Sequence, residues 1–108
     1  MSPRMQRGNV SVAANSVSAN QLAGELYEFI SRPTRIVLLA AAAAVGLNVT
    51  FLIGGVAVVN DQAVSQANRF PIAPDDVITS EVGAGRLTLT FRNTTGAAII
   101  VNWAVDVL

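Results

Sequence analysis

Residues 36–59 read IVLLAAAAAVGLNVTFLIGGVAVV and form the longest apolar stretch of the chain, with Asn48 and Thr50 as its conventional polar side chains. About 20 apolar residues are enough for a helix to cross a membrane. Arg32 and Arg35 precede the stretch, as an orientation signal would, and the alanines at 40–44 favour helix by intrinsic propensity. One alternative for this stretch is therefore a single membrane-spanning helix at 36–59.

The order of the residues favours β-strands instead. Every second residue from Leu47 to Ile53 is large and apolar, whereas Asn48 and Thr50 occupy alternate positions, which is the period of a strand. Gly54-Gly55 has the composition of a two-residue hairpin turn between two segments rich in β-branched residues. We therefore predict buried strands in 36–59, with a hairpin that turns at residues 54–55, and no membrane partner.

The last part of the chain, 86–108, predicts a second hairpin. In RLTLTFRN the apolar side chains alternate with threonine and arginine, and NTTG at 93–96 is a turn signal. In AIIVNWAVDVL the odd-numbered positions from Ile99 to Val107 are apolar, so this strand also has one buried face. Trp103 lies on that face and is predicted to be a core aromatic.

The remaining segments add weaker strand signals. Val77-Ile78-Thr79 is a short strand candidate, Gly83-Ala84-Gly85 reads as a flexible turn, and residues 25–31 lean to strand. Pro33 excludes a central-strand position at that point. Six to eight short strands separated by turns predict an all-β fold: a single antiparallel β-sandwich, jelly-roll-like, with an extended N-terminal arm.

The arm is expected at residues 1–24, and the sandwich domain at 25–108. The arm is small and polar, carries Arg4 and Arg7, and has no acidic residue before Glu25. Such a segment cannot bury enough apolar area to fold alone. It is either an ordinary disordered terminus or an arm that becomes ordered on neighbouring subunits.

The amino-acid composition of the chain limits the kinds of partner that it can bind. Apolar residues make up 52% of the chain and charged residues 13%, against about a quarter in ordinary soluble domains. A surface with so little charge is expected to be buried against copies of the chain, a larger assembly or a bilayer. The net charge is zero, which argues against a dedicated nucleic-acid binder, so we expect nucleic-acid contact at Arg4 and Arg7 at most.

Catalytic chemistry has little support. The chain has no cysteine and no histidine, which removes the thiol nucleophile and the commonest general base. We predict no catalytic, cofactor-binding or metal-binding residues, no cofactor and no small-molecule substrate.

We interpret the acidic residues as solvent-exposed carboxylates in turns. Asp75, Asp76, Glu81 and Asp61 could supply oxygen ligands for calcium, but adjacent strand residues point to opposite faces and no calcium-loop spacing is present. The arginines at 69, 86 and 92 are instead expected to pair with Asp75, Asp76 or Glu81.

This pattern resembles small bacteriophage virion proteins with a single sandwich or jelly roll, of the minor capsid, vertex or decoration type. The resemblance rests on the arm at 1–24, on LNVTFLIGGVAVVNDQ at 47–62, and on RLTLTFRNTTGAAIIVNWAVDVL at 86–108. It implies a non-enzymatic structural protein of the virion, whose partners are copies of itself or another capsid protein. It also implies an arm that laces neighbouring subunits. The alternative, a sandwich that binds carbohydrate or a cell surface, predicts an exposed cluster of aromatic residues.

Overall fold

The computed structural model describes residues 4–25, 28–67, 69–72 and 75–108. These residues form strands and loops and no helix, which confirms the all-β prediction. The six strands are β1 (Arg4–Val12), β2 (Phe29–Ala42), β3 (Leu47–Ile53), β4 (Val56–Ala63), β5 (Val77–Asn93) and β6 (Ile99–Val107).

The membrane-helix alternative for residues 36–59 is wrong. These residues form the second half of β2, all of β3 and the first half of β4. No helix among the described residues is long and apolar enough to cross a membrane. The alternation of apolar and polar residues in 47–53 outweighs the helix propensity of the preceding alanines. Three of these, Ala40, Ala41 and Ala42, lie in the end of β2 that is buried on both faces.

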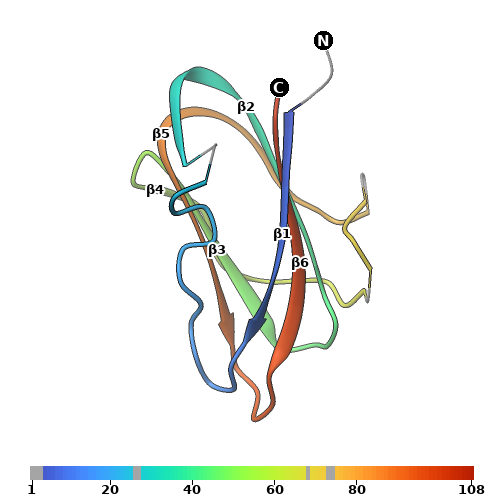
Figure 1. Ribbon diagram of the computed structural model, residues 1–108. Coiled ribbons are helices and arrows are strands. Elements are labelled where there is room, and N and C mark those ends of the chain that lie inside the picture. Colours follow the sequence, from blue (N-terminus) through green and yellow to red (C-terminus); the bar gives the residue numbers. More distant parts are fainter. Residues whose placement is uncertain (1–3, 26–27, 68, 73–74) are drawn as a thin grey trace.

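The strands are hydrogen-bonded in the order β1-β6-β2-β5-β3-β4, and neighbouring strands are antiparallel. Strand β5 lies between its two partners and pairs with them along different parts of its length: residues 77–86 pair with β2, and residues 87–93 pair with β3. The sheet therefore folds over itself, and its two halves face one core, which is the arrangement of a β-sandwich (Figure 1).

The fold-over occurs at Gly83-Ala84-Gly85, which the sequence predicts to be a flexible turn. That prediction is wrong, because all three residues lie within β5. Gly85 has a φ of +107°, and a Cβ atom on Gly83 would come within 2.5 Å of Cγ2 of Ile53. These glycines let a continuous strand bend closely over the core.

The predicted hairpin at 54–55 is present: β3 ends at Ile53 and β4 begins at Val56, and the two turn glycines, Gly54 and Gly55, have φ values of +60° and +85°. The predicted hairpin at 86–108 is wrong. β5 and β6 follow each other through residues 94–98 but do not pair, because residues 87–93 pair with β3 in one half of the sandwich and β6 pairs with β1 and β2 in the other. The inward residues of both strands are buried as predicted. Trp103 is 3% exposed, which confirms its place in the core.

Pro33 lies inside β2, although the sequence excludes a central-strand position there. The pairing of β2 with β5 is interrupted between Ile30 and Thr34, so Pro33 sits in an irregularity where no ladder hydrogen bond is required of it. Within the segment predicted to lean to strand, β2 begins at Phe29; residues 26–27 lie outside the described residues.

Residues 4–12, expected in a separate arm, form β1 and pair with β6 from Arg4↔Val107 to Val12↔Ile99. The chain then follows β5, with hydrogen bonds from Ser18 N to Phe91 O and from Gln21 N to Leu89 O, both 2.8 Å. Leu22 is fully buried. The described part of this segment therefore packs on its own sandwich, because it satisfies backbone groups of β6 and β5 that would otherwise lack partners.

Candidate interaction site

Asp76 is the most deeply buried acidic residue, at 4% exposure, and its carboxylate stabilises a loop. Its Oδ2 accepts hydrogen bonds from Arg69 Nη2 at 3.0 Å and from the backbone N of Ile72 at 2.9 Å. The backbone O of Asp76 accepts from Ala40 N. The predicted pairing of Arg69 with one of the nearby acids is confirmed, and its role is to hold the segment before β5 against β2.

The other two predicted arginine pairings are wrong. Arg92 pairs with Asp61 through two hydrogen bonds, at 2.6 and 2.9 Å, and Arg86 pairs with Glu28 at 3.0 Å. The bidentate bond to Arg92 holds the pKa of the Asp61 carboxyl below its usual value, and the same bond raises the pKa of Arg92. Asp61 lies in β4 and Glu28 directly precedes β2, so both are distant in sequence from their arginines and could not be identified by closeness along the chain.

The four acids considered for calcium are not brought together. Asp61 lies in β4, Asp76 is engaged by Arg69, and Asp75 and Glu81 are exposed at either end of the first half of β5. In the part of the chain that the structure describes, no three acidic residues are close enough to hold a metal ion. The carboxylates that have partners contribute to the fold.

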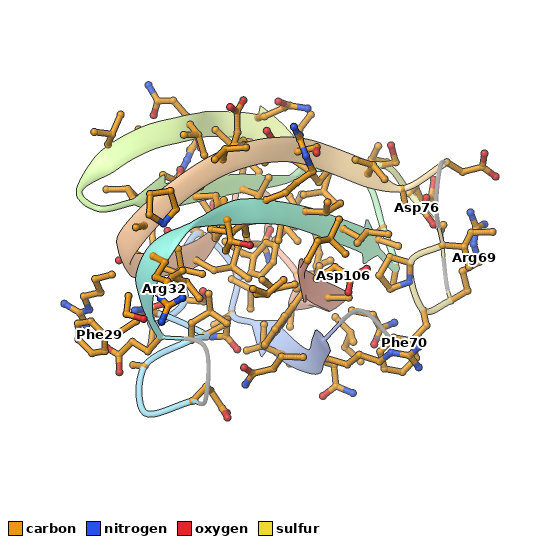
Figure 2. The ribbon with its side chains drawn as sticks, turned by 90° about the horizontal axis from the view of Figure 1, so that it is seen from above. Phe29, Arg32, Arg69, Phe70, Asp76 and Asp106 are labelled. Atoms are coloured by element: carbon orange, nitrogen blue, oxygen red, sulfur yellow. The ribbon has the colours of Figure 1, made fainter. Side chains whose placement is uncertain are left out.

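The exposed aromatic residues are not clustered either. Phe29 is 66% exposed and Phe70 is 46% exposed, and the two lie on opposite sides of the molecule (Figure 2). Phe70 is covered on one side by the guanidinium of Arg7, 5.5 Å from the ring centre. Among the described residues there is thus no aromatic platform of the kind that the carbohydrate-binding alternative predicts; Tyr27 lies outside them.

One end of the sandwich is formed by three loops that carry no charge. They are residues 13–16 (AANS), 43–46 (AAVG) and 94–98 (TTGAA), which follow β1, β2 and β5 and lie together at the lower end of Figure 1. We call these three loops the uncharged end. The charged residue nearest to these loops along the chain is Arg92, which is paired with Asp61.

Hydrogen bonds join the three loops into one surface. Thr94 N donates to Gly46 O at 2.9 Å, Asn15 N donates to Thr95 O at 3.0 Å, and Asn93 N donates to Ser16 O at 2.9 Å. The polar backbone groups of the loops thus bond to one another. Fewer backbone N–H and C=O groups of these loops therefore depend on water for their hydrogen bonds.

The buried side chain of Asn93 reinforces these contacts. It is 1% exposed, and its Nδ2 donates to the backbone O of Val12 at 3.0 Å and of Ala97 at 2.7 Å. Its Oδ1 accepts from the N and Oγ1 of Thr95, both at 2.8 Å. Asn93 therefore connects the end of β1 to the β5–β6 turn and fixes their relative positions.

Large apolar side chains are exposed in and beside the uncharged end. Val45 is 69% exposed at the tip of the β2–β3 loop. Ile100 is 54% exposed, and its backbone O accepts from Ala43 N. Val17, which follows the first loop, is 61% exposed. An exposed apolar area without charges is the kind of surface that proteins use for contact with other proteins.

The opposite end carries both termini and is charged (Figure 1). A row of directly paired residues crosses four strands there: Arg4, Val107, Ile36 and Glu81. Arg35 precedes Ile36, and its backbone O accepts from the N of Leu108. The molecule therefore has one charged and one uncharged end.

Sequence reasoning missed the uncharged end, although a signal was present. Charged residues are absent from 8–24, 36–60 and 93–105, and each of these stretches contains one of the three loops. Taken alone, the charge-free stretch at 36–59 indicates either a membrane helix or buried strands. Its relation to the other two becomes visible when the fold places the three loops together.

Comparison with known proteins gives no relative from which a role could be transferred: no protein-family model matches the chain, and no curated protein matches it.

Proposed function

We propose that this protein is a non-enzymatic structural component of a virus particle, of the bacteriophage type, which acts by self-association or by attachment to a capsid lattice. The observation that carries the proposal is the uncharged end, where apolar side chains are exposed on and beside loops that are hydrogen-bonded to one another. A protein that works alone gains nothing from such a surface, whereas an assembling subunit can bury it against a neighbour.

The distribution of charge supports the same proposal. Three of the arginines are bound to acidic residues of the same chain: Arg69, Arg86 and Arg92. They add no net charge to the faces where they lie. Subunits of an assembly must approach closely without repulsion, and faces with internally compensated charge allow this.

The β4 edge of the sheet disfavours open-ended aggregation. β4 is an edge strand whose pairing with β3 is irregular at two places, and it carries Asp61 with a φ of +54°. Such irregularities and charges on an edge strand hinder pairing with another chain. Association is therefore proposed to use the loops and faces of the sandwich more than the β4 edge.

The proposal is tested on virus particles whose genome encodes this chain. Purified particles, separated from unassembled protein by density-gradient centrifugation, would be analysed by quantitative peptide mass spectrometry. We expect the chain in a fixed copy number per particle that matches a symmetry of the capsid. Its absence from purified particles, together with its presence in the infected cell, would contradict the proposal.

A further inference from the structure

From the structure we infer that the uncharged end is a contact between two copies of this chain, arranged about a twofold axis so that each copy presents the same loops. The inference rests on the proposed function, because it names the surface through which a self-associating subunit meets its copy. It follows from the chemistry of residues 13–16, 43–46 and 94–98 and from what each class of partner would require.

The absence of charge at the uncharged end favours a second copy of the chain as its partner. A twofold contact brings identical groups near one another, so a charged surface would place like charges together at a cost. The uncharged end has no charged group to bring together, and no charge has to be stripped of water there. The opposite end carries Arg35 and Glu81, which are exposed and would lose hydration if they were buried against an uncharged surface. This disfavours a head-to-tail arrangement.

The other classes of partner fit this surface poorly. Nucleic acid requires arginine or lysine at the contact, and a lipid surface is usually met by aromatic side chains with basic residues beside them. The uncharged end contains neither. The exposed phenylalanines, Phe29 and Phe70, lie elsewhere on the molecule (Figure 2).

The size of the uncharged end indicates how strong a contact it can make. The three loops contain four, four and five residues, whereas a stable interface buries about 800 Å² and roughly 20–30 residues on each partner. A contact of this size is weak on its own. It therefore contributes one interface among several in a closed assembly, and its loss should yield a smaller, discrete species.

The test uses Val45, which is exposed at the tip of its loop, so that a charge is tolerated there by the fold. Val45→Asp, Val45→Lys and the unchanged protein would be compared by sedimentation velocity over a range of concentrations. We expect each variant alone to lose the contact, with self-association at least about tenfold weaker than that of the unchanged protein. Val56→Asp is the matched control. Val56 is 65% exposed and is the first residue of β4, beyond the β3–β4 turn, whereas Val45 lies just before the start of β3. Its substitution should leave association unchanged.

Mixing the two charged variants tests the symmetry. In a twofold contact Val45→Asp and Val45→Lys face each other, so an equimolar mixture should recover the assembly that each variant loses. Near-ultraviolet circular dichroism of Trp103 would establish that every variant is folded.

Three outcomes would contradict the inference. If Val45→Asp assembles like the unchanged protein, the twofold contact is wrong, while self-association through another surface stands. If both variants lose assembly and their mixture does not recover it, the loops meet a different surface and the twofold contact is wrong. If the unchanged protein does not associate at all, the self-association on which the inference rests is itself contradicted.

Discussion

Gly8 and Trp103 show how a single residue type determines the packing of an edge strand. The two residues are directly paired between β1 and β6. A Cβ atom on Gly8 would come within 2.4 Å of Cζ2 and 2.7 Å of Cε2 of the indole. The indole therefore lies against the backbone of β1, and glycine is the residue that leaves room for it.

Substitution of Gly8 by alanine should destabilise the protein. The indole is a buried, rigid group and must shift, and overpacking of this kind costs about 1–3 kcal/mol. Urea unfolding followed by Trp103 fluorescence measures the change in the free energy of unfolding. Gly96→Ala is the control, since a Cβ atom there meets nothing within 4 Å. Equal stability of Gly8→Ala and the unchanged protein, with an unaltered fluorescence spectrum, would show that the packing is misdescribed.

Asn93 is the second residue whose side chain decides local structure. Leucine at this position has a similarly branched side chain but cannot form the hydrogen bonds that Asn93 makes with the backbone groups of Val12, Ala97 and Thr95. We expect Asn93→Leu to lower the free energy of unfolding by about 3 kcal/mol. Asn102→Leu, which removes a single bond to Arg69 O at 3.2 Å, should cost about 1 kcal/mol or less. Equal losses in the two variants would contradict the role given to Asn93.

At the scale of elements, the β3–β4 turn contains two glycines with different requirements. Both have positive φ, but a Cβ atom on Gly54 would come within 2.8 Å of Ala84 O, whereas one on Gly55 meets nothing within 4 Å. Asparagine tolerates the left-handed conformation, so Gly55→Asn should cost about 1 kcal/mol or less, and Gly54→Asn about 2 kcal/mol or more. Thermal unfolding of the two variants measures the difference, and a larger loss for Gly55→Asn would overturn this reading of the turn.

The ion pair between β4 and β5 gives a dependence on pH. The pKa of Asp61 is lowered in the folded protein by its hydrogen bonds to Arg92. A lowered pKa stabilises the fold above the unfolded-state value, and this contribution disappears as the pH falls through the folded-state value.

Asp61→Asn isolates the charge, since asparagine also accepts the φ of +54°. The unchanged protein should have the higher midpoint of urea unfolding at neutral pH, and the two midpoints should converge as the medium becomes acidic enough to protonate Asp61. Because both side chains are exposed, the difference is small and should shrink with added salt. A difference that grows on acidification would contradict the pairing.

Elements with strong periodicity were predictable from sequence, and elements defined by distant partners were not. The hairpin at 47–63 and the buried faces of the strands in 86–108 follow from alternation and turn composition, which are local. That β5 and β6 belong to opposite halves of the sandwich and do not form a hairpin depends on their distant partners. β1 was missed because Gln6 and Gly8 stand on its inward face, paired with Val105 and Trp103 of β6, so the sequence shows no apolar face there. The bend of β5 was missed because a Gly-Ala-Gly segment has the same composition in a turn and in a bent strand.

At the scale of the whole molecule, the sandwich separates charge along its length. The charge-free segments meet at the uncharged end, and the termini carry charge at the other. The sequence allowed the prediction that the chain buries surface against a neighbour. It could not indicate where, because that depends on how three loops from distant parts of the chain come together.

The most direct test of the account is the native mass of the unmodified protein, purified without detergent and measured by native mass spectrometry and multi-angle light scattering over a concentration series. The account predicts a discrete oligomer with a fixed number of subunits, because the uncharged end provides a surface for self-association and irregular, charged β4 limits further growth. A protein that stays monomeric at every concentration, or that is recovered only with detergent, would contradict the account.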